Sequence, residues 1–66
     1  MKVRANGKTM EVAENTSLWG FVLLCKIKPE TVIIELNERV IRRNTWTETV
    51  LMEGDRIELV TFVGGG

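Results

Sequence analysis

The chain contains no histidine, no tyrosine and a single cysteine, Cys25. One thiol cannot form an internal disulfide, and it falls short of the four ligands of a structural zinc ion or an iron–sulfur cluster. Without histidine, the usual general base beside a nucleophile is also missing. The composition therefore argues against metal, iron–sulfur and cysteine–histidine chemistry on this chain.

Long apolar runs are missing too. No stretch approaches the roughly 20 apolar residues that a membrane-spanning helix needs. Residues 1–6 lack the charged leader and apolar run of a secretory signal. The absence of a disulfide framework agrees with a reducing compartment. We therefore expect a cytoplasmic protein with no membrane partner.

No charge of one sign dominates, because nine basic and nine acidic side chains cancel and are scattered along the chain. A protein that binds nucleic acid needs a basic face to hold the phosphates. We therefore expect no nucleic acid partner.

The chain has 66 residues, which is enough for one domain. A domain of this size buries only about 60% of the surface of its unfolded chain, so its core is small. It has little room for a deep substrate cleft. A binding partner, a carrier or a subunit is favoured over a complete enzyme.

Asn6-Gly7 is the strongest turn signal in the chain. Apolar and polar residues alternate on both sides of it, and an Asn-Gly between two such runs is typical of a β-hairpin. We predict two antiparallel strands, near residues 2–6 and 9–13.

A helical period follows the hairpin. The apolar stripe with i, i+3, i+4, i+7 spacing comprises Leu18, Phe21, Val22 and Cys25. Thr16 or Ser17 supplies an N-cap, and Pro29 cannot continue a helix. We predict one helix over residues 18–28.

The second half of the chain reads as strands. Residues 32–36 are rich in β-branched side chains, Asn37-Glu38 is a turn, and residues 40–41 form a short strand. Glu53-Gly54-Asp55 is a turn before a last strand over residues 56–63.

Residues 43–53 show no clean period, and we predict a loop with one helical turn near residues 47–51. The element order indicates an α+β fold, with one mixed sheet of four to five strands and one main helix across one face. This domain is predicted to span residues 1–63, followed by a flexible tail over residues 64–66.

The tail is the place where chemistry is expected. Gly64, Gly65 and Gly66 directly follow an apolar strand and end in a carboxylate. A tail without side chains can enter a channel too narrow for other residues, and glycine also adopts positive φ. Two other interpretations stay open, a frayed end and a remnant of cloning.

Several separated motifs resemble the ThiS group of sulfur carriers, ubiquitin-like proteins that serve thiamine biosynthesis. The resemblance extends along nearly the whole chain. The matching residues are Asn6-Gly7-Lys8, Thr16 to Leu18, Pro29-Glu30, Leu36-Asn37-Glu38, Arg43 followed by Trp46, Gly54-Asp55-Arg56-Ile57-Glu58 and Phe62-Val63-Gly64-Gly65. The resemblance implies a ubiquitin-like β-grasp fold.

It also implies a chemical role. An E1-like (ThiF-type) adenylyltransferase would use ATP to adenylate the C-terminal glycine, and sulfur from a donor system would convert it to a thiocarboxylate. Thiazole synthase (ThiG-type) would receive the sulfur. The modified residue would be Gly66, or Gly65 if the last residue is absent or trimmed, with Gly64 and Gly65 threading the tail into the partner. Many members end in two glycines, whereas this chain ends in three.

On this interpretation the chain is a recycled cosubstrate, not an enzyme, and it binds no cofactor of its own. A carrier of the same kind could instead serve molybdopterin synthesis or tRNA thiolation. A β-grasp interaction module that carries no sulfur is the alternative of a different class.

Two sets of apolar residues are candidates for partner docking. Val60 and Phe62 alternate with Ile57 and Leu59 on the last strand, so they lie on the outer face if the latter are in the core. A strand buried on both faces is the alternative. Trp19 and Leu23 fall off the helical stripe, so either the core wraps around the helix or they form an exposed patch for docking or weak dimerisation.

The other candidate side chains have structural explanations. Cys25 shares the helical stripe and is expected to be a small buried residue. We expect Arg43 to be solvated and Trp46 to be a partly buried anchor. Glu53, Asp55 and Glu58 are expected to form a solvated acidic edge, possible contacts for basic residues of a partner.

Overall fold

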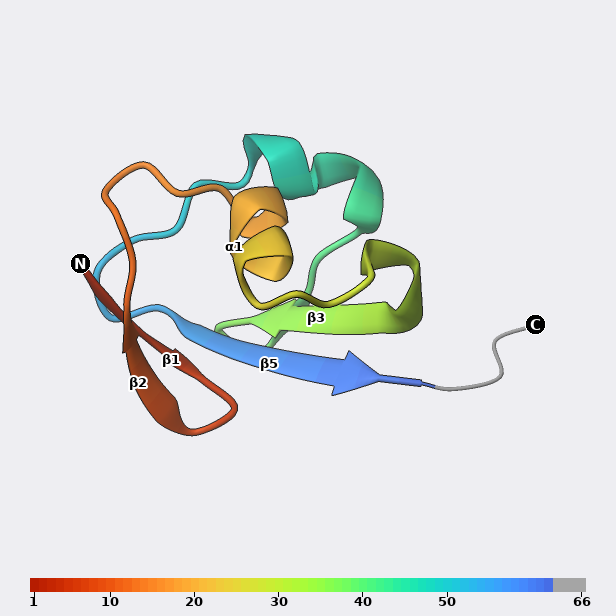
Figure 1. Cartoon of the computed structure of the whole chain (residues 1–66), viewed down its shortest axis with the longest axis horizontal. Coiled ribbons are helices and arrows are strands. Elements are labelled where there is room, and N and C mark those ends of the chain that lie inside the picture. Colours follow the sequence, from red (N-terminus) through yellow and green to blue (C-terminus); the bar gives the residue numbers. More distant parts are fainter. Residues whose placement is uncertain (63–66) are drawn as a thin grey trace.

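The computed structural model describes residues 1–62, which form a five-stranded mixed sheet with one α-helix across one face (Figure 1). In chain order the elements are β1 (Lys2–Ala5), β2 (Lys8–Glu11), α1 (Leu18–Leu24), the 3-10 helix η1 (Pro29–Thr31), β3 (Val32–Leu36), β4 (Arg39–Val40), the 3-10 helix η2 (Arg43–Glu48) and β5 (Arg56–Thr61). The predicted fold class and element order are confirmed. The predicted tail over residues 64–66 and Val63 lie outside the described residues.

The last strand occupies the middle of the sheet, whose order is β2-β1-β5-β3-β4. β5 runs parallel to β1 and antiparallel to β3. β1 belongs to the hairpin with β2, and β3 belongs to the hairpin with β4. The two hairpins never pair with one another within the described part of the sheet, because β5 separates them. The C-terminal strand therefore joins the two halves of the domain.

Both hairpins close through two-residue turns with left-handed backbone. Asn6 and Gly7 have φ of 50° and 82°, and Asn37 and Glu38 have φ of 52° and 72°. Positive φ at both positions is the feature of a type I′ turn, whose twist matches that of paired strands. Both predicted turns are confirmed. Pairing resumes directly after each turn, so β2 begins at Lys8 and β4 at Arg39, earlier than predicted.

The asparagine of each turn also bonds the backbone of β5. The Asn6 side-chain amide donates to the Leu59 carbonyl at 3.2 Å, and its oxygen accepts from the Leu59 amide at 2.7 Å. The Asn37 oxygen accepts from the Arg56 amide at 3.0 Å. The two turn residues thus fasten their hairpins to the middle and to the start of the central strand.

α1 begins at Leu18 because Ser17 caps it. The Ser17 hydroxyl accepts from the Gly20 amide at 3.0 Å, which satisfies one of the free amides of the first turn. The predicted helix start is confirmed, with Ser17 in the capping role.

The helix ends earlier than predicted, at Leu24 rather than at residue 28. Lys26 adopts a left-handed φ of 60°, its amide donates to the Leu23 carbonyl, and the Ile27 amide donates to the Val22 carbonyl. These two bonds form a Schellman motif, which closes a helix. The prediction failed because the position that usually holds glycine is a lysine here. Pro29 instead starts η1.

The helical turn predicted near residues 47–51 lies earlier in the chain, as η2. Its position depends on Trp46, which is only 1% exposed and was predicted to be partly buried. The Trp46 indole Nε1 donates to the Ile41 carbonyl at 2.9 Å, so the ring satisfies its polar atom while it fills the core.

The core lies between the sheet and the helices (Figure 1). Its buried side chains are Val3, Ala5, Val12, Leu18, Phe21, Val22, Val32, Ile34, Trp46, Leu51 and Ile57. α1 contributes three of them from one face. The opposite face of the sheet carries no helix within the described residues (Figure 1), and its Ile33, Val40 and Val60 side chains are exposed.

Replacing Asn6 with glycine tests how much the side-chain bonds to Leu59 contribute to stability, because the turn itself is kept. Glycine keeps the positive φ, but Asn6→Gly removes both side-chain hydrogen bonds. We expect a loss of about 1–2 kcal/mol in the free energy of unfolding, measured by urea denaturation. Asn15→Gly is the matched control, because Asn15 also has a positive φ and its side chain bonds nothing among residues 1–62. Equal losses in the two variants would contradict the bonding role of Asn6.

Lys26→Gly should stabilise the domain. Lysine is strained in the left-handed region and glycine is not, so we expect a gain of about 0.5–1 kcal/mol and a melting temperature several degrees higher. Lys28→Gly is the control, because Lys28 has a φ of −72° and gains no relief. Calorimetry that finds no gain for Lys26→Gly over the control would refute this account of the helix end.

Candidate functional site

The candidate site begins where β5 ends. Ile57 is fully buried and Leu59 is half-buried against the core, whereas Val60 and Phe62 on the other face are 54% and 42% exposed. The predicted alternation is therefore confirmed, and the alternative of a strand buried on both faces is wrong. Val60 and Phe62 are apolar, exposed and close to the start of the tail. Their role in docking stays a prediction.

These two residues belong to a larger apolar surface. Ile33 on β3 lies directly opposite Val60, and Val40 on β4 occupies the same face of the sheet. Ile33 is 47% exposed and Val40 is 65% exposed. We call Ile33, Val40, Val60 and Phe62 the outer-face patch. Ile33 and Val40 were not among the predicted docking residues, although the alternation within residues 32–36 separates Ile33 from the buried Val32 and Ile34.

Two glutamates face one another beside the patch. Glu35 and Glu58 are directly opposite on β3 and β5, and neither forms an ion pair within residues 1–62. Like charges opposite one another on a sheet are destabilising. The outer face therefore combines exposed apolar side chains with a local negative charge.

The acidic edge predicted from Glu53, Asp55 and Glu58 does not form a single group. The Glu53 carboxylate accepts from the Lys2 amide at 2.9 Å, and the Asp55 carboxylate accepts from the Met52 amide at 2.7 Å. Asp55 therefore closes a local turn, whereas Glu53 ties that turn to the start of β1. Glu58 alone of the three lies on the outer face of β5.

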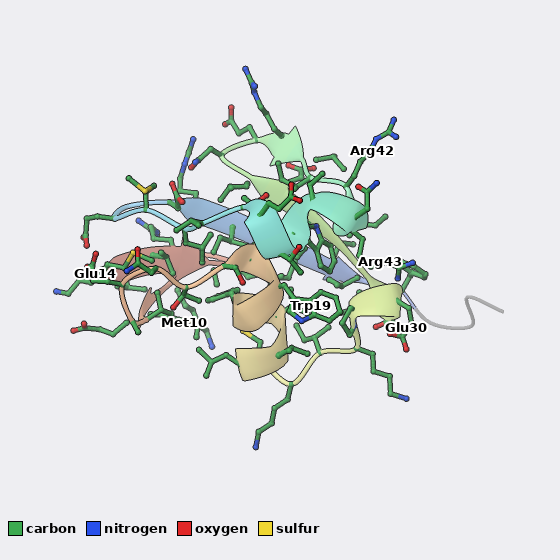
Figure 2. The ribbon with its side chains drawn as sticks, turned by 90° about the horizontal axis from the view of Figure 1, so that it is seen from above. Met10, Glu14, Trp19, Glu30, Arg42 and Arg43 are labelled. Atoms are coloured by element: carbon green, nitrogen blue, oxygen red, sulfur yellow. The ribbon has the colours of Figure 1, made fainter. Side chains whose placement is uncertain are left out.

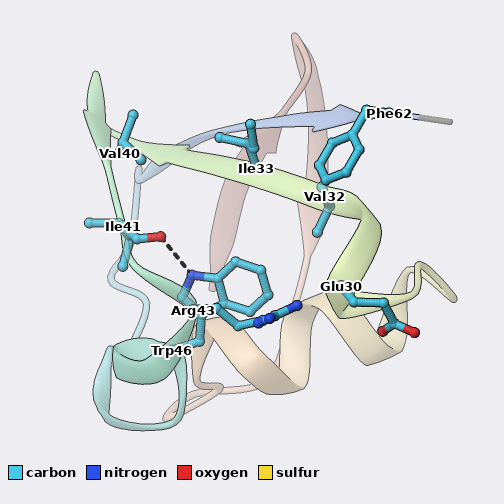
Figure 3. Close-up of a pocket in the computed structure, with 8 residues that line it drawn as sticks. All are labelled: Glu30, Val32, Ile33, Val40, Ile41, Arg43, Trp46 and Phe62. Atoms are coloured by element: carbon cyan, nitrogen blue, oxygen red, sulfur yellow. Dashed lines mark hydrogen bonds between the residues drawn. The ribbon is translucent and has the colours of Figure 1, made fainter. Parts of the chain in front are cut away.

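A groove of about 310 Å³ opens at the β3 edge of the sheet (Figure 3). Its lining residues are Glu30, Val32, Ile33, Val40, Ile41, Arg43, Trp46 and Phe62. Trp46 forms part of its wall, and its bond to the Ile41 carbonyl fixes the indole there. Arg43 is exposed, as predicted, and extends along the groove toward Glu30 (Figure 3). The groove shares Ile33, Val40 and Phe62 with the outer-face patch.

Trp19 and Leu23 differ from one another in their surroundings. Trp19 is half-buried, and its ring centroid lies 6.4 Å from that of Trp46. Viewed from above the helix, it lies between α1 and η1 (Figure 2). Leu23 is 51% exposed. The core thus extends to Trp19 and stops short of Leu23. Because α1 covers the inner face of the sheet, neither residue shares a surface with Val60 and Phe62.

The thiol of Cys25 is poorly placed for nucleophilic chemistry. Cys25 is the C-cap residue of α1 and is half-buried against the core, less deeply than predicted. Burial raises the pKa of the Cys25 thiol, which lowers the fraction of the reactive thiolate. A working role for this side chain finds no support in the geometry.

Residues 1–62 contain neither a metal-binding cluster nor a membrane-spanning helix. No group of three or more acidic or cysteine side chains there is arranged to hold a metal ion. No helix in that range has the length and apolar character needed to cross a bilayer. The predicted modification residue Gly66, its alternative Gly65, and Gly64 lie outside the described residues.

Comparison with known proteins shows which family this chain resembles. The sequence profile of the ThiS family matches residues 3–66. The chain is 39% identical to a thiazole synthase from Magnetococcus marinus, covering all of this chain but only 20% of that protein. It is 31% identical to the sulfur carrier protein ThiS of Bacillus subtilis, covering 97% of this chain and 98% of that one.

The fold agrees with a solved structure of similar sequence. The crystal structure of the thiamine biosynthesis protein ThiS from Geobacter metallireducens superposes with a TM-score of 0.86 at 33% identity, and the match covers 100% of both chains. The sheet order, the helix start and the whole-length profile match therefore have one explanation: the chain belongs to the ThiS family.

Proposed function

We propose that this chain is the sulfur carrier of thiamine (thiazole) biosynthesis and that its working group is the C-terminal glycine carboxylate. The carrying observation is the family match, which includes residues 64–66 and so extends to the end of the chain. The solved ThiS protein that covers this chain completely also supports the proposal.

The chemistry needs two steps, both on a partner. The Gly66 carboxylate attacks the α-phosphorus of ATP on an E1-like adenylyltransferase, and pyrophosphate leaves. A hydrosulfide-equivalent sulfur from a donor system then attacks the acyl carbon of the adenylate, and AMP leaves. The product is a thiocarboxylate, and the carrier acts as a recycled cosubstrate without a bound cofactor. If the chain is trimmed, Gly65 takes this role.

Thiazole synthase is the proposed acceptor of the sulfur. The support is the thiazole synthase of Magnetococcus marinus, a fifth of which resembles this whole chain at 39% identity. A protein that contains both a carrier-like segment and thiazole synthase sequence is best explained if the two parts work together. This observation favours thiazole synthesis over molybdopterin synthesis and tRNA thiolation.

The outer-face patch is the proposed docking surface for the adenylyltransferase. Phe62 lies four residues before Gly66, and an extended chain spans at most about 3.3–3.6 Å per residue. The reacting carboxylate is therefore within about 14 Å of Phe62. A partner that covers the patch holds the domain at a distance that the tail can bridge. Glu35 and Glu58 beside the patch favour a partner surface with basic residues.

A mass measurement tests the carrier chemistry directly. The chain is incubated with ATP, an E1-like adenylyltransferase and a sulfide source, and is then digested with trypsin. Cleavage after Arg56 releases residues 57–66 as one peptide. Replacement of one oxygen by sulfur should add about 16 Da to this peptide, and fragmentation should locate the sulfur on Gly66.

Two controls make this result decisive. Reactions without ATP should show no mass gain, and deletion of Gly65 and Gly66 should abolish the gain while the melting temperature stays unchanged. An unchanged mass, with an adenylyltransferase proven active on another carrier, would refute the carrier function and favour a β-grasp interaction module.

The docking surface is tested by Phe62→Asp. Phe62 is 42% exposed, so a charge there should reduce the rate of adenylation by about tenfold or more while the free energy of unfolding changes by about 0.5 kcal/mol or less. Adenylation is measured by pyrophosphate release.

Val50→Asp is the matched control, because Val50 is 47% exposed and lies outside the patch. It should leave adenylation unchanged. A large drop in melting temperature for Phe62→Asp, or equal rate losses in both variants, would remove the patch from the docking model.

A further inference from the structure

The groove at the β3 edge contains unpaired backbone groups. Two bonds fix the alternation of the β3–β5 ladder: the Phe62 amide donates to the Thr31 carbonyl, and the Asn37 amide donates to the Arg56 carbonyl. Because bonded and non-bonded pairs alternate in an antiparallel ladder, the amide and carbonyl of Val32 point away from β5. They therefore point toward the β4 side of the sheet.

β4 does not reach that part of the edge. It pairs only with Glu35 and Leu36, and the last bond of the hairpin runs from the Ile41 amide to the Ile34 carbonyl. The chain then turns away into η2, where the Ile41 carbonyl accepts from Trp46. Among the described residues, no bond from a neighbouring strand thus reaches the Val32 amide or carbonyl. An edge of this kind can pair with an added strand.

The groove beside this edge is suited to a chain lying across it. It is open along one side and mostly apolar, with walls from Val32, Ile41 and Trp46 (Figure 3). Its volume of about 310 Å³ is at the low end for a small-molecule site, and among residues 1–62 its charged lining residues are Glu30 and Arg43. An enclosed ligand would need more polar groups around it. One large apolar side chain of an extended segment fits better.

Charge selects the chemistry of that segment. Arg39, Arg42 and Arg43 follow one another closely along the β4 to η2 side, and none forms an ion pair within residues 1–62. Arg42 extends into solvent, whereas Arg43 lies at the same end of the molecule as Glu30 (Figure 2). Glu30 and Arg43 balance one another in the lining, so the excess of positive charge comes from Arg39 and Arg42, which neighbour lining residues in the sequence. Acidic residues in a partner would complement it.

We propose that this groove binds an extended segment of a partner protein by strand addition at Val32. The segment places one apolar side chain against Trp46 and an aspartate or glutamate beside Arg43. Backbone bonds to Val32 supply the alignment, and the two side chains supply the selectivity. The groove shares Ile33, Val40 and Phe62 with the outer-face patch, but its peptide binding does not involve the tail and is tested without the sulfur chemistry proposed above.

Selection from a display library of random nonapeptides tests the proposal. The full chain is the target, and the Arg43→Glu variant is used for counter-selection. Enriched peptides should combine an apolar residue with an Asp or Glu within two positions of it. A synthetic peptide from this set should bind the wild-type chain about tenfold or more tightly than Arg43→Glu. Lys8→Glu, a charge reversal at the opposite sheet edge, should change binding by about twofold or less.

N-methylation of the peptide distinguishes strand addition from contact with the outer-face patch, and it needs no protein variant. Alternate residues of an added strand face the edge. Methylation at the residue that pairs with Val32 should abolish binding, whereas methylation at its two neighbours should leave it within about threefold. Amide exchange at Val32 should slow when the peptide is bound.

Three results would overturn the proposal: no peptide enriched over the counter-selection, enriched peptides without an acidic residue, or a methylation profile without alternation. A second copy of the chain is the competing occupant. Sedimentation equilibrium that shows a wild-type dimer converted to a monomer by Arg43→Glu would assign the groove to self-association and would also overturn the proposal.

Discussion

The constraint on which this structure depends is the central position of its last strand. β5 separates two hairpins that do not pair with one another in the described sheet, and each hairpin turn contributes an asparagine side chain that bonds the β5 backbone. A domain with so few buried side chains has little stability to spare. Bonds that tie both halves of the chain to one strand therefore matter more here than in a larger core. The same strand leads directly to the tail.

Sequence reasoning predicted the elements whose signals are local. Asn6-Gly7 and Ser17 worked because turn and capping chemistry depend on neighbouring residues only. The end of the helix was predicted wrongly, because Lys26 occupies a left-handed position that glycine usually marks. The position of η2 was predicted wrongly. Trp46 determines it through a buried ring and a bond to the Ile41 carbonyl, and both depend on tertiary packing.

The candidate site was predicted in part for the same reason. Val60 and Phe62 follow from the alternation of one strand. Ile33 and Val40 join them only through the register between β3, β4 and β5, which one sequence does not give. The predicted acidic edge does not form, because Asp55 bonds the nearby Met52 amide and Glu53 bonds the Lys2 amide, a partner distant in the sequence. Strand alternation thus predicts which face a residue occupies, and the register determines which residues meet there.

The stability of the isolated domain does not explain the outer face. Four apolar side chains exposed by 42–65% gain little from folding, and the opposed Glu35 and Glu58 oppose it. On the inner face, by contrast, every fully buried polar side-chain atom of the described residues is satisfied. The inner face buries its apolar side chains and satisfies its polar atoms, whereas the outer face exposes apolar side chains and opposes like charges. Such a face is best explained by binding. β5 carries both faces, so the strand that closes the core also positions the exposed apolar surface that we propose for docking.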